Sequence, residues 1–228
     1  MAAPRFERGR LAADGQFWGL SNRGSVGLLA IPFAGAAVVA LAWSRPGVYY
    51  GLVREDSVLE WLQFASYVAV AVLAAWTTAR LRRPSPWLAA AFVLFALFGL
   101  LAAGEEVSWG QRLFGLGTPH ELAEVNNQEE LNVHDVAEVQ GKLNLGLALA
   151  SLYGLLAPLL VRRRVLVVPP LALAGAFFAM LAYTCARAAF FPHPSHALAK
   201  FSEWPEACFA GALGLFALLA WRKADPEK

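Results

Sequence analysis

Six apolar stretches, each long enough to cross a lipid bilayer, constrain the fold of this chain more than any other feature. They lie near residues 26–43, 57–80, 86–103, 143–161, 165–186 and 204–221, and each contains about 18 to 24 residues. At about 1.5 Å per helical residue, such a stretch spans roughly 30 Å of hydrocarbon. The alternation of a transmembrane barrel is missing, and a helix satisfies its backbone groups within one segment, as lipid requires. The sequence therefore predicts an all-α, polytopic transmembrane helix bundle of six spans.

The composition supports a membrane protein and excludes some other classes. Hydrophobic residues make up 58% of the 228 residues, charged residues make up 16%, and the mean hydropathy is +0.48. These values lie outside the range of ordinary soluble domains. The net charge is only +2 and no basic patch stands out, so we expect membrane lipid as a partner and no nucleic acid.

The distribution of charge predicts how the bundle is oriented. If the N-terminus is cytoplasmic, the cytoplasmic pieces hold 13 of the 19 Lys and Arg residues but only four of the 17 Asp and Glu residues. This agrees with the positive-inside rule. We therefore expect a bacterial inner-membrane protein with a cytoplasmic N-terminal tail (1–25), a six-helix domain (26–222) and a cytoplasmic C-terminal tail (223–228).

The polar outer loop at residues 104–142 is the main candidate for function. It lies between the third and fourth spans and holds eight acidic residues, two basic residues and two of the four histidines. Ionisable groups at a membrane edge are costly, and inside a span they are functional by default. The loop is therefore predicted to form a site on the outer face.

The spacing of residues in this loop predicts its local structure. If the third helix continues past Gly104, then Glu105, Ser108 and Arg112 share one face at i, i+3 and i+7. The sequence from Thr118 to Glu121 is a capping box with proline at the first helical position, which predicts a short amphipathic helix on the outer surface.

A second helix is expected to restart near Leu131 and to continue into the fourth span. That helix would place His134 and Glu138 one turn apart. Trp109 is interpreted either as an anchor in the outer leaflet or as the wall of a pocket.

Carboxylates and histidines that converge could bind a divalent metal ion, zinc or another, which makes hydroxide available near neutral pH. The same groups could instead perform general acid/base chemistry or bind a cationic head group. The candidate residues fall into three groups: catalytic Glu105, Glu106, Ser108 and His134; substrate-binding Trp109, Gln111, Arg112, Asn127, Gln128 and Asn132; and metal-binding Glu130, His134, Glu138, His193 and His196. The simplest alternative is a solvated acidic loop with ordinary Glu105–Arg112 and Glu138–Lys142 ion pairs.

Other polar groups on the outer side could join this site. Glu60 is expected to cap the second span, whereas a charge within a span, as at Glu206, costs about 2.5–3.5 kcal/mol. Cys185 and Cys208 lie at similar predicted depths, which leaves open whether they form a disulfide.

Two resemblances rest on particular residues. The run from Glu105 to Gly115, followed by Asn127, Gln128, Glu130, Asn132 and His134, resembles a pattern in bacterial multi-pass membrane proteins that are uncharacterised. The chain is also loosely similar to the alkaline-ceramidase-like membrane hydrolases, which combine a serine, an aspartate and three metal-binding histidines. That resemblance implies corresponding roles for Ser108, Asp135, His134, His193 and His196.

These observations lead to two functional hypotheses from different classes. The first is a metal-assisted hydrolase or transferase that acts on a lipid or a lipid-linked substrate, with Arg112 holding an anionic group. The second is a non-enzymatic membrane component that binds a partner protein or passes a small solute.

Overall fold

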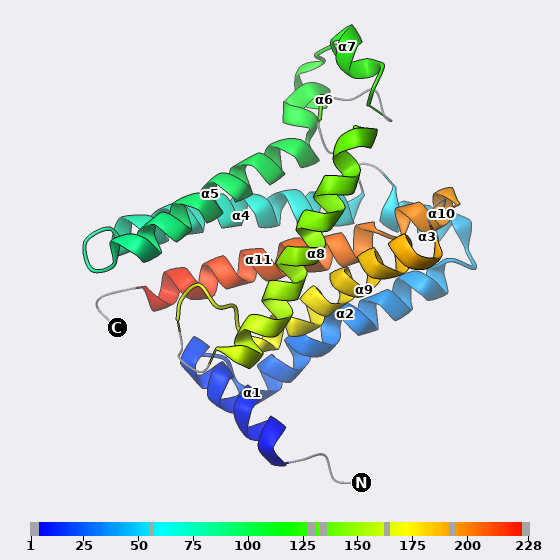
Figure 1. The fold of residues 1–228 in the computed structure, drawn as a ribbon. Helices are drawn as coiled ribbons and strands as arrows, with labels where there is room; N and C mark the ends of the chain where they lie inside the picture. Colours follow the sequence, from blue (N-terminus) through cyan, green and yellow to red (C-terminus); the bar gives the residue numbers. More distant parts are fainter. Residues whose placement is uncertain are drawn as a thin grey trace.

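The computed structural model describes residues 5–54, 57–126, 131–132, 136–161, 165–191 and 195–224. In this part of the chain the regular structure is helical, apart from one isolated β-bridge between Asn126 and Val136. The elements, shown in Figure 1, are α1 (Arg5–Trp18), α2 (Asn22–Ala42), α3 (Pro46–Val53), α4 (Val58–Leu81), α5 (Pro86–Glu106), η1 (Ser108–Gly110), α6 (Gln111–Phe114), α7 (His120–Ala123), α8 (Ala137–Leu160), η2 (Leu171–Leu173), α9 (Ala174–Phe190), α10 (His196–Lys200) and α11 (Glu203–Lys223).

The prediction of a six-span helical bundle is confirmed. In the described part of the chain, six helical segments are long and apolar enough to cross a membrane. Each segment consists mainly of one long helix, and the six helices are α2, α4, α5, α8, α9 and α11. These helices lie close to the six predicted stretches. The short helices α6 and α7 lie between the third and fourth spans, where a short outer helix was expected.

Two short segments were not foreseen. Helix α1 occupies part of the expected N-terminal tail, and α3 precedes the second span. The fifth span also begins later than predicted, at Leu171 rather than near residue 165. Pro169 and Pro170 explain this delay, because a residue that precedes proline is pushed out of the helical region.

The bundle consists of one group of helices packed around α4 and a second group packed around α9, and α11 belongs to both. Helix α4 packs between α5 and α11, and α9 packs against α8, α11 and α2 (Figure 1). The main core is aromatic where α9 and α11 meet, with Phe177, Phe209 and Phe216 buried together with Trp18 of α1.

Glycines allow the helices to approach closely, as expected for a bundle that packs within lipid. A Cβ atom on Gly175 of α9 would lie 2.2 Å from the backbone oxygen of Leu29 in α2. A Cβ atom on Gly35 would lie 1.9 Å from the Trp204 ring, which inserts against α2 and donates a hydrogen bond of 2.9 Å to the carbonyl of Pro32. These contacts fix α9 and the start of α11 against α2.

The outward surface of the spans is apolar. Large hydrophobic side chains such as Leu41, Leu94 and Leu160 are strongly exposed along the helices. So many exposed large apolar side chains are rare on monomeric soluble proteins, but they are expected where lipid covers the surface.

One end of the bundle gathers basic residues and is called the basic end. Arg80, at the end of α4, donates a hydrogen bond of 2.7 Å to the carbonyl of Trp221 and lies over its ring. Lys223 lies over the ring of Phe17 in α1. The opposite end, where α4 and α11 begin and α5 ends, is called the acidic end.

Helix α1 caps the ends of two other helices at the basic end. Arg10 donates hydrogen bonds to the carbonyls of Pro158 and Leu159, which are near the C-terminus of α8. The carboxylate of Asp14, only 1% exposed, accepts a hydrogen bond of 2.7 Å from the backbone N–H of Leu171, where η2 begins. Each charge is matched to the helix end that favours it.

Candidate functional site

The first part of the candidate site is a polar stripe on α4. Glu60, Gln63 and Tyr67 follow one another at i, i+3 and i+7, so they share one face of the helix. Ser57 caps the helix, because its hydroxyl accepts from the backbone N–H of Glu60 at 3.5 Å. Gln63 is only 1% exposed and Tyr67 is also buried, so this face points into the bundle.

The second part is Glu203, at the start of α11. Its Oε2 atom accepts a hydrogen bond of 3.0 Å from Nε2 of Gln63. Its Oε1 atom lies 3.9 Å from Nζ of Lys200, and both side chains are 17% exposed. The carboxylate is therefore largely removed from solvent and is oriented by one amide and one ammonium group.

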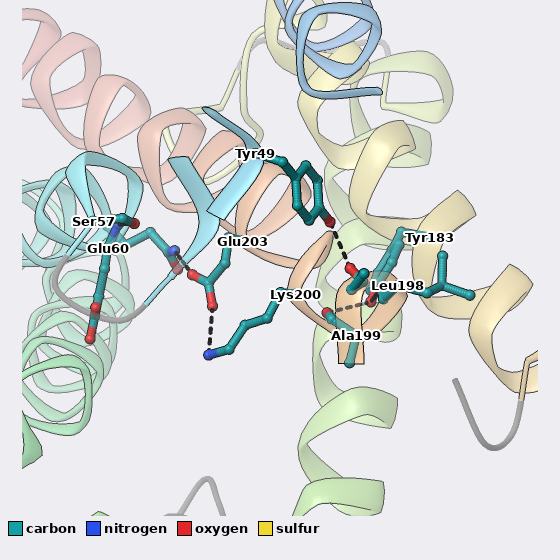
Figure 2. A network of polar contacts seen from close by, with 10 residues as sticks. Tyr49, Ser57, Glu60, Tyr183, Leu198, Ala199, Lys200 and Glu203 are labelled. Carbon is teal, nitrogen blue, oxygen red and sulfur yellow. Dashed lines mark hydrogen bonds and ion pairs between the residues drawn. The ribbon is translucent and has the colours of Figure 1, made fainter. Parts of the chain in front are cut away.

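Helix α10 places Lys200, and two tyrosines hold that helix from other elements. The hydroxyl of Tyr49, which belongs to α3 and is labelled in Figure 2, donates a hydrogen bond of 2.6 Å to the carbonyl of Ala197. The hydroxyl of Tyr183, from α9, donates to the carbonyl of Ala199 at 3.2 Å (Figure 2). Since both bonds reach the backbone of α10, the position of Lys200 depends on α3 and α9 together.

Three more glutamates influence the carboxyl group of Glu203. Glu60, Glu106 and Glu206 are each close enough to interact electrostatically with its carboxyl group. We call the set formed by Glu60, Gln63, Glu106, Glu203 and Glu206 the glutamate site. Negative charges gathered in a poorly solvated place attract a cation or a proton. The glutamate site can therefore bind a cationic group or exchange protons with a substrate.

Helix α5 continues past Gly104 as expected, but only to Glu106, so the expected helical face that Glu105, Ser108 and Arg112 would share does not form. Helix α5 ends at Glu106, and Ser108, Trp109 and Gly110 have φ values of 45°, 52° and 79°. This left-handed backbone is costly for residues other than glycine. The Trp109 ring packs against Gly104 and its indole N–H donates to Oε1 of Glu105 at 2.7 Å, which stabilises the turn.

Polar side chains beyond this turn bind one another. Nδ2 of Asn132 donates to the hydroxyl of the buried Ser108 at 3.2 Å. Nδ2 of Asn126 in turn donates to the backbone and side-chain oxygens of Asn132 at 2.8 and 2.9 Å. We call these three residues the polar knot.

Gln111 braces the same region from α6. Its Nε2 atom donates to Thr118 at 2.6 Å, and its Oε1 atom accepts from the backbone N–H of Leu131 at 2.5 Å. The predicted substrate-binding residues Gln111 and Asn132 thus connect parts of the loop that are far apart in the sequence.

The expectation of a helix that restarts near Leu131 is also wrong. Leu131 and Asn132 are not helical, Val136 is extended and pairs with Asn126, and α8 begins at Ala137. Helix α8 therefore begins later than expected, and His134 lies outside the described residues.

Several candidate residues fall outside the described part of the chain. They are Asn127, Gln128, Glu130, His134, Asp135 and His193, together with the side chains of Arg112 and Glu138. Their predicted roles remain predictions.

The metal site likewise remains a prediction. Among the residues that the structure describes, no three His, Cys, Asp or Glu side chains converge to hold a metal ion. His196 instead stacks on the ring of Tyr50, with centroids 5.9 Å apart. Cys185 and Cys208 are both free thiols.

Sequence reasoning overlooked Gln63, Lys200 and Glu203. A signal was available, because Gln63 lies between Glu60 and Tyr67 on one face of an otherwise apolar span. Glu203 and Glu206 are likewise three residues apart at the start of α11.

Comparisons of the chain with family models, with curated proteins and with solved structures gave no match.

Proposed function

We propose that this protein is a membrane-embedded enzyme that binds a cationic head group of a lipid or lipid-linked substrate at the glutamate site. The observation that carries the proposal is the Glu203 carboxylate, which is largely removed from solvent and held by Gln63 amid three other carboxylates. A charged group in such surroundings costs free energy, so an ionisable cluster at a membrane edge indicates a role in binding or catalysis. An ammonium group is its natural complement.

The proposed chemistry is hydrolysis or transfer by general acid/base catalysis. One glutamate takes a proton from the attacking water or hydroxyl group, and a second returns a proton to the leaving group. Glu203 and Glu106 are the candidates, because they come from different helices, α11 and α5, and interact electrostatically. Lys200 would be the group that the substrate's ammonium displaces from Glu203.

We also propose that a divalent metal ion, zinc or another, takes part in the reaction. Its proposed ligand His134 lies outside the described residues. Metal analysis of the purified protein beside His134→Ala tests it. Stoichiometric metal that is lost in the variant would support a metal-assisted reaction, and equal metal content in both proteins would contradict a role for His134.

We further propose that the basic end faces the cytoplasm of a bacterial cell and that the glutamate site faces outward. The support is the positive-inside rule, since Arg80, Lys223 and Arg10 lie together at the basic end. Cysteines introduced at Arg83 and Gly117 should be labelled from opposite sides of the membrane. Labelling from the same side would contradict this orientation.

Purified protein reconstituted in vesicles tests the function itself. Phosphatidylethanolamine carries an ammonium group and phosphatidylglycerol does not, so native mass spectrometry should show selective retention of the first lipid. Mass spectrometry of the vesicle lipids would show whether it is also converted to a product. Equal retention of the two lipids would contradict the proposal.

The matched variants are Glu203→Gln and Glu124→Gln. Both remove one carboxylate, but the Glu124 side chain is 66% exposed and pairs with His120 outside the glutamate site. Selective retention and conversion should be lost in Glu203→Gln and kept in Glu124→Gln. Selective retention without any product would support the non-enzymatic alternative, a membrane component that binds a partner or passes a small solute.

A further inference from the structure

Among the described residues between α5 and α8, some polar side chains are buried while large apolar side chains are exposed. Ser108, Asn126 and Asn132, the polar knot, are buried and bound to one another. Trp109, Phe114 and Leu116 are exposed, and Phe114 is 76% exposed. This distribution is the reverse of that in a segment surrounded by water.

Within the described chain, the exposed apolar side chains have no protein surface to cover them. Helix α6 packs against η1, and Figure 1 shows α6 and α7 beyond the end of α5, at the margin of the bundle. Phe114 contacts Gly110 at the start of the same short segment. Three large apolar side chains within eight residues would form a costly exposed patch in water.

Lipid is the occupant that best fits this patch. The segment follows directly on α5, whose residues Leu100 and Leu101 are exposed on the surface of a membrane span. Trp109 combines an exposed ring with an indole N–H that is bonded to Glu105, the arrangement that suits a membrane interface. In lipid, polar groups must be satisfied internally, and the polar knot and Gln111 meet this requirement.

The α7 region of the segment, in contrast, exposes polar and charged side chains. His120 and Glu124 of the α7 region pair at 3.4 Å with side chains 84% and 66% exposed. Charged and polar groups this exposed need water or lipid head groups around them. The segment therefore has one apolar part and one polar part.

We propose that residues 109–116 insert into the interfacial region of the leaflet at the acidic end, with α7 above them in water. Trp109, Phe114 and Leu116 form the inserted surface. This inference does not depend on the proposed enzymatic activity. It assigns the segment a second role, as an anchor that keeps the end of α5 and the adjacent glutamate site at the membrane surface.

Site-directed fluorescence tests the insertion. In protein whose Cys185 and Cys208 are replaced by alanine, single cysteines at Phe114 and Leu116 would be labelled with an environment-sensitive fluorophore. Matched controls are cysteines at His120 and Glu124, in the same segment. The purified proteins would be reconstituted in phosphatidylcholine vesicles with iodide on both sides of the bilayer.

Labels at Phe114 and Leu116 should resist iodide and be quenched by lipids that carry a nitroxide near the head group. Labels at His120 and Glu124 should be several-fold more sensitive to iodide. Equal iodide quenching at all four positions would overturn the proposal. Protection of Phe114 in native membranes but not in these vesicles would also overturn it, because the patch would then be covered by a partner protein.

Discussion

The two ends of the bundle use charged residues in different ways. At the basic end, Arg10 and Arg80 donate to backbone carbonyls, and Asp14 accepts from a backbone N–H. At the acidic end, Glu203 is held by the side chains of Gln63 and Lys200. Backbone groups at helix ends need partners in any fold, so the charges at the basic end have a structural explanation.

Helix ends explain only part of the glutamate site. Glu60 lies in the first turn of α4, and Glu203 and Glu206 lie in the first turn of α11, where a negative charge is favoured. Helix ends do not explain why these carboxyl groups and Glu106 lie close enough to interact with one another in a poorly solvated place, where each one raises the free energy of the others. Natural proteins commonly keep such unfavourable groups where function requires them. The comparison therefore predicts opposite effects of mutation: loss of stability at the basic end and loss of function at the acidic end.

The largest effect is expected for Glu203→Gln. It should lower turnover of an ammonium-bearing lipid by about 100-fold or more, which is the range for loss of an acid/base group. Thermal stability in detergent should stay the same or increase, because glutamine keeps the shape of the side chain and removes an ionisable group from a poorly solvated cluster. A large loss of stability would show that Glu203 is structural and would remove the contrast between the two ends.

The next effect is expected for Asp14→Leu at the basic end. It leaves the backbone N–H of Leu171 unpaired and should lower the free energy of unfolding by about 2 kcal/mol. Asp14→Asn keeps a hydrogen-bond acceptor, so its free energy of unfolding should fall by less. The measurement is reversible unfolding in mixed detergent, and lipid binding per folded molecule should remain normal. Loss of binding without loss of stability would contradict the structural role of Asp14.

A smaller effect is expected for Gln63→Leu. The hydrogen bond that orients Glu203 is lost, so affinity for the ammonium-bearing lipid should fall about tenfold. Gln63→Glu also removes the amide donor, but it adds a carboxylate that attracts the ammonium group, so its affinity should fall less than that of Gln63→Leu. If Gln63→Leu has wild-type affinity, the orientation of Glu203 by Gln63 is unimportant.

The smallest effect is expected for Arg80→Ala. One hydrogen bond to Trp221 and a contact with its ring are lost, which should cost about 1 kcal/mol of unfolding free energy. Arg80→Lys keeps the charge and should recover part of this loss. Binding that falls in Arg80→Ala while stability is unchanged would show that the basic end also contributes to function.

The spans were predictable because lipid imposes a simple rule on sequence. A helix that crosses hydrocarbon needs about 20 apolar residues, so all six spans are recognisable without knowledge of their packing. The separation of basic and acidic residues between the two ends was also predictable, from the charged residues in the segments that connect the spans. Local breaks were predictable only in part: Pro119 correctly indicated the start of α7, but Ser108 and Trp109 gave no local signal for a left-handed turn.

The sequence by itself determined the class of protein, the six spans and the polarity of the two ends, because these depend on local hydropathy and on charge. Only the tertiary structure decided which polar groups meet. Gln63 and Glu203 are 140 residues apart and Ser108 and Asn132 are 24 apart. Their pairing depends on how α4 packs against α11 and on how the chain returns after α6. Close packing at small residues determines those contacts, and side-chain patterns within single helices do not reveal them.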